Sequence, residues 1–271
     1  MKTTKSNESN TTFLPIKASS ISIVLSLGAI CNTAIAQQTV PFATEPISVD
    51  GKLNEQAWSR SSWLPMNHHI VGEIPSKEDF SGSYKLLWDE NYLYLAAKIT
   101  DDVLYDRFAN PLEKYWDDDC LEVFIDEDKS GGNHQFNFNA FAYHIALDNQ
   151  AVDIGFEDAP GGPFILLNEH INSVWKRHSK APHDIIWEVA IEIHDQSFEP
   201  NKQTNSRVKL KSGKQMGFML AYCDNDGSEQ REHFMGSHKI HPVNGDKNLG
   251  YITADVFGDI ILGRKLKNNT N

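Results

Sequence analysis

The sequence predicts an all-β protein built as a single antiparallel β-sandwich of the immunoglobulin-like or jelly-roll-like kind, with few short helices. Two observations favour this fold. Many short runs of alternating or apolar residues follow one another, and turn residues separate them at near-regular spacing. Helical periodicity is almost absent, and no internal repeat or change in composition marks a domain boundary after residue 36.

The first 36 residues are expected to be a secretory signal peptide. Three lysines precede an apolar run over 21–30, and a small-x-small cleavage signal follows at 34–36. The run is too short to cross a bilayer as a stable helix. A lipoprotein interpretation around Cys31 is weaker, because a bulky residue precedes that cysteine. We therefore expect an exported domain over 37–271, either periplasmic or extracellular.

The composition bears on the partners of this chain. It has 25 Lys and Arg against 37 Asp and Glu, a formal net charge of −12. Nucleic-acid binding relies on neutralising phosphates, so the acidic balance argues against that partner. It suits an exported protein that binds neutral glycans or cations. After residue 36 no segment is long and apolar enough to span a membrane, and we expect a monomer.

The domain is expected to begin with extended chain and one short helix. Residues 37–50 are extended and end in a turn at Asp50-Gly51. A short helix is expected over 53–61, with Asn54 as its N-cap. Trp58 and Trp63 are interpreted as core residues rather than as platforms for a ligand.

Paired strands account for most of the remaining chain. Two aromatic and apolar runs, 83–88 and 92–99, are joined by a tight polar loop, which is typical of a β-hairpin. Alternation and flanking turns predict further strands, with the ranges 119–126, 134–141, 143–147, 151–154, 164–176, 185–193, 216–223, 231–234 and 257–262.

The stretch from Tyr115 to Asp126 carries the first functional hypothesis. Side chains alternate along a strand, so one face presents a set that includes a carboxylate and the other a wholly apolar set. The two sets are Cys120, Glu122 and Phe124 against Leu121, Val123 and Ile125. The polar face brings Glu122 near Trp116, and an indole with a fixed carboxylate can hold a sugar. A half-buried strand after an acidic turn is the alternative.

The run over 134–141 also alternates. Its phenylalanines point one way, and Gln135, Asn137 and Asn139 point the other. A strand that keeps a row of amides on one face is either exposed to solvent or lines a polar site. Both interpretations stay open from these residues alone.

Taken in order, several stretches resemble the family 9 carbohydrate-binding modules. The most informative runs from Trp116 through three aspartates to Cys120-Leu121-Glu122, and it is supported by six others, at 49–58, 86–94, 135–139, 187–191, 217–224 and 257–258. Their order and spacing hold from about residue 45 to 263. Each motif alone is weak, but the ordered set is fairly specific for the fold.

The resemblance implies a β-sandwich that binds an oligosaccharide or polysaccharide without cleaving it, often with structural calcium. In that family an indole and a carboxylate of the Asp-rich motif touch the sugar, which corresponds to Trp116 and Glu122. The arginine after the second Asp-rich turn corresponds to Arg231. The amide-bearing face corresponds to Asn137 and Asn139.

The sequence departs from the family pattern in the loop before the last strand. Sugar binders of the family clamp the ligand between two indoles, and the second indole comes from this loop. Here residues 238–256 contain no Trp, and Tyr251 is the candidate to replace it. Ala221 stands where a longer polar residue can contact sugar. The resemblance therefore supports the fold of this chain more strongly than it supports the identity of the ligand.

Two further hypotheses concern metal ions and cysteines. Calcium prefers several oxygen ligands, and the candidates in the acidic turns are Asp126, Asp128, Asp224 and Asp226. If strand 119–126 lies antiparallel to 217–224 with Glu122 opposite Ala221, Cys120 falls opposite Cys223. Cross-strand neighbours lie near disulfide range, so we hypothesise a bridge between these two cysteines.

Two alternative functions remain open. A haem-binding electron-transfer or sensory module could use the histidines 233, 238 and 241 with Met235 as an axial ligand, although no CxxCH motif is present. Zinc would use the same histidines, without an HExxH motif. A glycoside hydrolase needs two carboxylates at a set separation, and acids are too frequent here for the sequence to select a pair.

Overall fold

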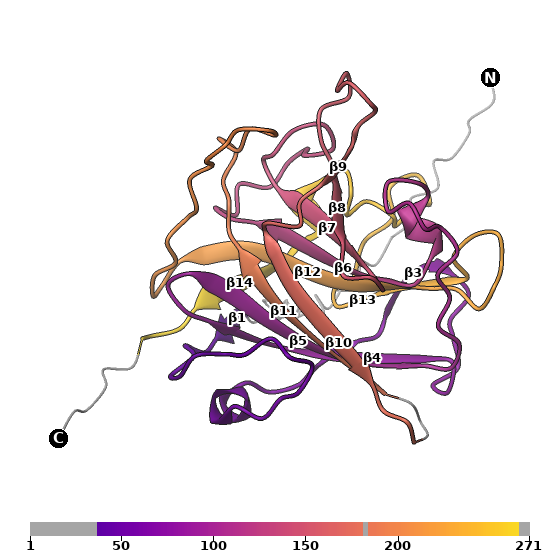
Figure 1. Cartoon of the computed structure of the whole chain (residues 1–271), viewed down its shortest axis with the longest axis horizontal. Helices are drawn as coiled ribbons and strands as arrows, with labels where there is room; N and C mark the ends of the chain where they lie inside the picture. Colours follow the sequence, from indigo (N-terminus) through magenta and orange to yellow (C-terminus); the bar gives the residue numbers. More distant parts are fainter. Residues whose placement is uncertain (1–36, 181–183, 266–271) are drawn as a thin grey trace, which may run out of the picture. The chain divides into compact units, whose positions relative to one another are not determined.

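The structure is a computed structural model that describes residues 37–180 and 184–265. Two β-sheets pack against each other, as the sequence predicts (Figure 1). Within the described ranges three short 3-10 helices lie in the connections, namely η1 (Gln56–Arg60), η2 (Tyr115–Asp117) and η3 (Ala254–Val256). The expected signal peptide lies outside the described residues.

The larger sheet has nine strands: β1 (Gln38–Val40), β3 (His68–Gly72), β6 (Cys120–Asp126), β7 (Phe141–Ala146), β8 (Ala151–Ile154), β9 (Phe164–Leu166), β12 (Gln215–Asp224), β13 (His233–Gly236) and β14 (Gly258–Leu262). Its main order is β1-β14-β12-β6-β7-β8-β9, and β13 links β12 to β3. The pairs are antiparallel except for β1 with β14. β12 and β6 are therefore interior strands of this sheet.

The smaller sheet has five strands: β2 (Leu64–Met66), β4 (Phe80–Trp88), β5 (Tyr92–Asp101), β10 (Ile171–Arg177) and β11 (Ile185–Glu192). They lie in the order β10-β11-β5-β4-β2, and all are antiparallel. The predicted hairpin is β4 with β5. Its loop closes because the Oδ1 atom of Asp89 accepts hydrogen bonds from the backbone of Asn91 and Tyr92, at 2.7 and 2.8 Å.

The core between the sheets confirms the predicted faces of β6. Leu121, Val123 and Ile125 are buried in a cluster that holds residues of both sheets, such as Phe218 of the larger sheet and Trp187 of the smaller one. Cys120 and Phe124 point to the opposite face and pack in a second cluster with Ala221 of β12. Burial of the apolar set fixes the register, since a slip of one residue would exchange the two faces. The outer face of β6, β7 and β12 is thereby free to form a site.

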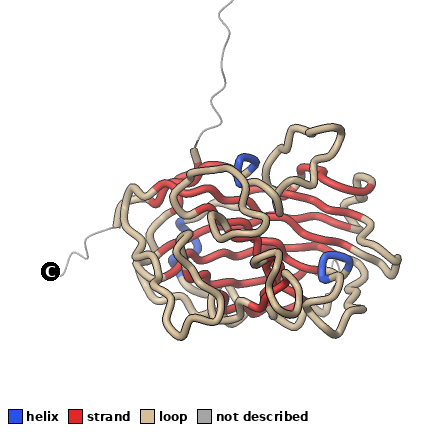
Figure 2. The backbone as a smooth tube through the Cα atoms, turned by 90° about the horizontal axis from the view of Figure 1, so that it is seen from above, coloured by secondary structure: helices blue, strands red, loops and turns tan. Residues whose placement is uncertain are grey.

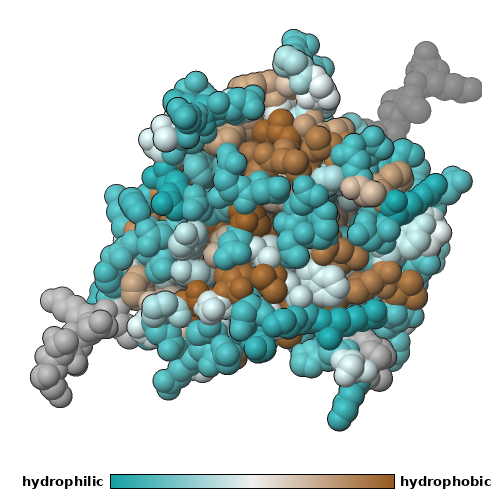
Figure 3. All heavy atoms as spheres, viewed as in Figure 1, coloured by the Kyte–Doolittle hydropathy of each residue, from teal (hydrophilic) through white to brown (hydrophobic). Residues whose placement is uncertain are grey.

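The loops surround the ends of the strands, as Figure 2 shows from above. On the face seen in Figure 3 hydrophilic side chains predominate, and hydrophobic ones form several patches, one of them in the upper half, where Figure 1 places β7 to β9. None of the helices in the described residues has the length and apolar character needed to cross a membrane.

Four expectations about local structure are wrong. The short helix begins at Gln56, and Glu55 rather than Asn54 occupies its N-cap position. Residues 134–140 form turns rather than a strand, and β7 begins only at Phe141. The expected strand 164–176 is divided into β9 and β10. Trp58 is buried as expected, but Trp63 is 38% exposed and has the ammonium group of Lys85 over its ring at 4.8 Å. Its contact with a charged stem explains how an indole remains at the surface.

Candidate functional site

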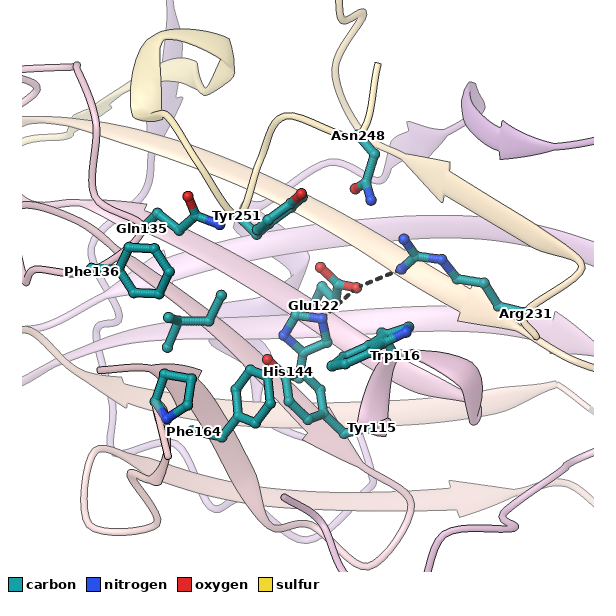
Figure 4. Close-up of a pocket in the computed structure, with 12 residues that line it drawn as sticks. Tyr115, Trp116, Glu122, Gln135, Phe136, His144, Phe164, Arg231, Asn248 and Tyr251 are labelled. Carbon is teal, nitrogen blue, oxygen red and sulfur yellow. Dashed lines mark hydrogen bonds and ion pairs between the residues drawn. The ribbon is translucent and has the colours of Figure 1, made fainter. Parts of the chain in front are cut away.

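A pocket of about 360 Å³ lies on the outer face of β6 and β7. Figure 4 shows twelve side chains that line it and ten of their names. Aromatic rings make much of the wall, and the polar groups converge on Glu122. The lining residues are Tyr115, Trp116, Glu122, Gln135, Phe136, His144, Ile154, Pro163, Phe164, Arg231, Asn248 and Tyr251.

Strand pairing brings the partners of Glu122 to it. His144 of β7 is directly opposite on one side, and Ala221 of β12 is directly opposite on the other. The Nε2 atom of His144 lies 2.7 Å from Oε1 of Glu122. The Nη1 atom of Arg231 lies 3.2 Å from the same oxygen (Figure 4).

The surroundings of Glu122 favour its ionised form. The side chain is buried, which disfavours charge, but His144 and then Arg231 outweigh burial and lower the pKa of the carboxyl below its usual value. An ionised carboxylate only accepts hydrogen bonds, so Nε2 of His144 carries the hydrogen in this contact. All three contacts, with the Cys223 thiol as the third, use Oε1. The second oxygen takes part in none of them.

The two cysteines share this network and are not bridged. The predicted register is confirmed, because Cys120 lies opposite Cys223 and Glu122 opposite Ala221. Both cysteines are nevertheless free thiols. Cys223 donates to Oε1 of Glu122 at 3.0 Å and accepts from Nη1 of Arg231 at 3.1 Å. The expected disulfide is therefore corrected: polar neighbours hold the Cys223 sulfur in place.

The loop before β6 presents Trp116. Its residues are fixed by the carboxylates of two aspartates. Asp118 accepts from the backbone of Arg107 and Phe108, at 2.9 and 2.7 Å, and Asp119 accepts from the backbone of Tyr105 at 2.6 Å. Tyr115 is buried and stands edge-on to both Trp116 and the His144 ring, with centroids 5.0 and 4.5 Å away. The indole is thus braced from behind while it remains partly exposed to the pocket.

Four of the six residues predicted to bind a ligand meet in this pocket, namely Trp116, Glu122, Arg231 and Tyr251. The other two, Asn137 and Asn139, do not line it. Asn137 accepts from the backbone of Asn139 at 2.9 Å, and Asn139 donates to the Gly131 carbonyl at 2.7 Å. The amides therefore close turns, because residues 134–140 do not form the strand that would have aligned them.

Sequence reasoning missed His144 and the aromatic residues Phe136 and Phe164. The signal for His144 was available, since it is the polar residue between two apolar ones in the predicted strand 143–147. Its pairing with Glu122 needed the order of the strands. Phe164 reaches the pocket from β9, and its ring centroid lies 5.8 Å from that of Trp116. No local pattern would have brought these two segments together.

A second centre consists of three buried aspartates, Asp101, Asp119 and Asp224. One carboxylate oxygen from each lies within 4.8 Å of the others. Both oxygens of Asp224 and one of Asp101 lack a hydrogen-bond partner among the described residues. Burial, followed by the charge of Asp101, raises the pKa of Asp119 to about 9 and that of Asp224 to about 8. Unpartnered buried carboxylates of this kind fit a cation with oxygen ligands.

The predicted calcium ligands divide into two pairs. Asp224 belongs to the buried centre, and Asp226 forms an exposed group with Asp79 and Asp102. Asp126 and Asp128 belong to none of the groups of three potential ligands among the described residues. They accept instead from the backbone of the following turn, where Gly131 donates to Asp126 at 2.7 Å.

The residues considered for haem lie away from the pocket. Met235 of β13 packs in the core between the sheets, so its sulfur does not face the pocket. The Nδ1 atom of His233 is 2.7 Å from the Glu73 carbonyl. His238 is hydrogen-bonded to Ser237 at 2.8 Å, and His241 lies in the loop that follows.

Comparison with known proteins places this geometry in a family. The family described as "Carbohydrate family 9 binding domain-like" matches residues 49–265. Endo-1,4-beta-xylanase C of Paenibacillus barcinonensis is 32% identical over 103 residues, which are 38% of this chain and 9% of that protein. Exoglucanase XynX of Acetivibrio thermocellus is 27% identical over 147 residues, or 54% of this chain and 11% of that protein. The chain thus spans about a tenth of these relatives.

Two solved structures share the fold. A family 9 carbohydrate-binding module of Caldicellulosiruptor kristjanssonii in complex with glucose has a TM-score of 0.61 and 19% identity, over 87% of this chain and 100% of that one. The module from the same organism in complex with cellotriose has a TM-score of 0.61 and 18% identity, over 87% and 97% of the two chains. Both matches cover the sandwich described above.

Proposed function

The chain belongs to the carbohydrate family 9 binding domain-like family, and from this premise we propose that it binds a saccharide without cleaving it, in the pocket of Trp116 and Glu122. The observation that supports this proposal most directly is that the Oε2 atom of Glu122 accepts none of the three hydrogen bonds made to this carboxylate. Three donors hold Oε1, while the other oxygen is available to accept a sugar hydroxyl. The neighbouring indole would cover the C–H face of the ring.

The aromatic lining of the rest of the pocket supports this proposal. The second indole of the family pattern is absent, but Phe136, Phe164 and Tyr251 supply aromatic surface from three separate segments. Gln135 and Asn248 add amides that can donate to and accept from hydroxyl groups. A mostly aromatic pocket with a few convergent polar groups is the usual form of a small-molecule site.

The lining favours binding over hydrolysis. Glu122 is the single carboxylate among the twelve lining residues, and its Oε1 is held by a buried ion pair. Glycoside hydrolysis needs a second carboxyl group as acid or base, at roughly 5 to 9.5 Å from the first. Measuring the release of reducing sugar separates the two functions. Release by the purified chain would favour the glycoside hydrolase alternative.

We extend the proposal to a structural calcium ion held by Asp101, Asp119 and Asp224. These residues come from the end of β5, the start of β6 and the end of β12. A bound cation would offset the repulsion between the carboxylates and tie together three segments. One of them is the Asp-rich loop that ends three residues after Trp116, so the ion would stabilise the sugar site from beneath.

The cellular role is proposed from the sequence and the relatives together. The expected signal peptide favours export to the periplasm or the outside of the cell. The xylanase and exoglucanase names of the relatives favour a part in polysaccharide catabolism. We propose that the exported chain acts as a monomer on an oligosaccharide or polysaccharide.

Calorimetric titration of residues 37–271 with glucose, cellotriose and a xylo-oligosaccharide tests the sugar proposal. Wild type should give binding heat, and Trp116→Ala should lose it. Trp63→Ala is the matched control, since it removes another partly exposed indole outside the pocket. Equal heat from Trp116→Ala, or silence of the wild type with all three sugars, would contradict the proposal. An absorption band near the Soret region after haem addition would then favour the haem alternative.

A further inference from the structure

A second hollow, of about 230 Å³, lies between β3 and the loop that follows β13. Ile240 forms part of its wall and is buried in the outer cluster on the larger sheet, so the loop is anchored there. A water occupies about 30 Å³ in the liquid, so the hollow has room for an ion of several atoms. Its lining residues are Asn67, His68, His69, Lys239, Ile240, His241, Pro242 and Lys247.

The charge of this hollow is opposite to that of the protein. The chain has a formal net charge of −12, yet the lining holds two lysines, three histidines and no acid. Neither Lys239 nor Lys247 forms an ion pair with any described residue. Two ammonium groups without counter-ions in a concave site create a local positive potential.

Hydrogen bonds hold one side of the hollow in place. The Nε2 atom of His69 lies 2.6 Å from the Gly72 carbonyl, which can only accept, so this nitrogen carries the hydrogen. The ammonium group of Lys247 donates to the His69 carbonyl at 3.2 Å. An ammonium has three hydrogens, so two remain for a ligand. The hydrogen bond to His69 therefore holds the ammonium group of Lys247 in place at the hollow.

We propose that this hollow binds an oxyanion, namely a sulfate, phosphate or carboxylate group, through Lys239 and Lys247. His68, His241 and Asn67 also line the hollow, and their side chains can add N–H donors. Charge-assisted hydrogen bonds from lysine to such groups are among the stronger polar contacts of proteins.

A metal ion fits this hollow less well than an anion does. Among the described residues, four groups of three have potential ligand atoms within 4.8 Å of one another, and none of them includes His68, His69 or His241. A metal would also bring positive charge beside two ammonium groups, which repel it. The spacing of the imidazoles and the lysine charges therefore both favour an anion.

The oxyanion can come from a free ion or from an acidic glycan. The loop after β13 lines both cavities, because Lys247 faces the hollow and the next residue, Asn248, lines the sugar pocket. Arg231 of the pocket and Gly236, which pairs with His68, are five residues apart and so at most roughly 17 Å from each other. A glycan that carries uronate or sulfate groups could reach both sites, and this glycan source rests on the proposed function.

The first experiment uses sodium sulfate and sodium phosphate alone. Titration into residues 37–271, at ionic strength held constant with sodium chloride, should give saturable binding and a higher melting temperature. Lys239→Gln/Lys247→Gln should bind about tenfold more weakly or not at all. Lys77→Gln/Lys211→Gln is the control, because it changes the net charge equally at two exposed lysines outside the hollow.

The single variant Lys239→Glu separates loss of sulfate binding from loss of folding. Lys239 is exposed, and its side chain forms no hydrogen bond or ion pair with any described residue, so this variant should unfold as the wild type does and still lose sulfate binding. The proposal is overturned if the wild type shows no effect beyond that of chloride. It is equally overturned if both lysine variants of the hollow respond as the wild type does.

The source of the anion is separated with sugars. A sulfated oligosaccharide and an oligogalacturonate are compared with a neutral cello-oligosaccharide. If the acidic sugars bind more tightly than the neutral one and lose that advantage in Lys239→Glu, the glycan is the source. If sulfate binds while the charge of the sugar has no effect, the source is the free ion. If the wild type binds sulfate but none of the sugars, the proposed function is contradicted while the anion site is retained.

Discussion

His144 lies directly opposite Glu122 across β6 and β7, and its Nε2 atom is 2.7 Å from Oε1 of the carboxylate. Arg231 reaches the same oxygen from the other side at 3.2 Å. The carboxylate is nearly fully buried, so it depends on these partners for its charge. Because His144 and Arg231 both contact Oε1, this oxygen of Glu122 is fixed while the other remains for a ligand.

Replacing His144 tests this relationship. His144→Ala would leave a buried carboxylate with one partner fewer, and we expect the free energy of unfolding to fall by about 2–3 kcal/mol. Sugar affinity should fall about tenfold, because Glu122 would lose its orientation. Urea unfolding and calorimetry measure the two effects. His144→Gln keeps an N–H donor and should recover part of both, whereas unchanged affinity in His144→Ala would contradict the role.

Tyr251 and Asn137 form a second, contrasting test. Tyr251 lines the pocket, so Tyr251→Ala should weaken sugar binding about fivefold to tenfold through lost aromatic contact. Asn137 only holds a turn, so Asn137→Ala should leave sugar affinity unchanged while it lowers stability by about 1 kcal/mol. Calorimetry on both variants decides. The reverse pattern would mean that the amide row binds the sugar and that the pocket is misplaced.

Local pattern was enough to predict the fold and two residues, Trp116 and Glu122, that line the candidate pocket. The alternation around Glu122 fixed which side chains of β6 meet the core, and the positions of Cys120 and Cys223 followed from pairing β6 with β12. Trp116 was identified because an indole beside an acidic turn has a recognisable chemistry. These features depend on neighbours in sequence or on one strand pair.

What could not be predicted depends on segments that are far apart in the chain. His144 meets Glu122 only because β7 follows β6 in the sheet, and Phe164 enters from β9. The turns at Asn137 and Asn139 replaced a strand because their side chains satisfy nearby backbone groups. The predicted disulfide is absent for a related reason. The predicted register is correct, but the Cys223 thiol donates a hydrogen bond to Glu122.

Calcium should stabilise the chain through the buried aspartates. At a calcium concentration about 100 times its dissociation constant, the free energy of unfolding should rise by about 2.7 kcal/mol over that in EDTA. Asp224→Asn should abolish this rise. In EDTA the same variant should be at least as stable as the wild type, because it removes a buried carboxylate that has no partner.

Asp128→Asn is the matched control for calcium. It changes an acid that the sequence also suggested as a ligand, but that belongs to none of the described groups of three potential ligands. Its calcium response should equal that of the wild type. A calcium response that survives Asp224→Asn but disappears in Asp128→Asn would move the ion to the turn after β6.

Thiol titration checks the correction of the disulfide. Residues 37–271 contain two cysteines, and both should react after unfolding without reductant, because neither is bridged. In the native protein both should react slowly, since they are buried and burial raises the pKa of each thiol. Absence of reactive thiols in the unfolded, unreduced chain would restore the bridge between Cys120 and Cys223.

The last prediction concerns His170, a buried histidine outside the sugar pocket. Its Nδ1 atom lies 2.9 Å from the hydroxyl group of Tyr143, and its ring stacks on His194 with centroids 4.0 Å apart. Nε2 has no hydrogen-bond partner among the described residues. Burial, together with the neighbouring His194, lowers the pKa of His170 to about 3. Protonation therefore opposes folding.

The sign of the pH effect follows from this pKa. An unfolded histidine titrates near pH 6.5, so between about pH 6.5 and 3 the unfolded chain binds the extra proton. The contribution of His170 to stability is thus complete above about pH 6.5 and is lost as the pH falls. Between pH 7 and 5 this single group should lower the free energy of unfolding by about 2 kcal/mol.

Urea unfolding at several pH values measures the effect. His170→Asn offers an acceptor near the position of Nδ1 but cannot take up the proton, so its stability should fall less steeply with acid than that of the wild type. His178→Asn changes an exposed histidine and should retain the wild-type slope. If His170→Asn and the wild type show the same slope between pH 7 and 5, the buried imidazole is not the source of the acid sensitivity.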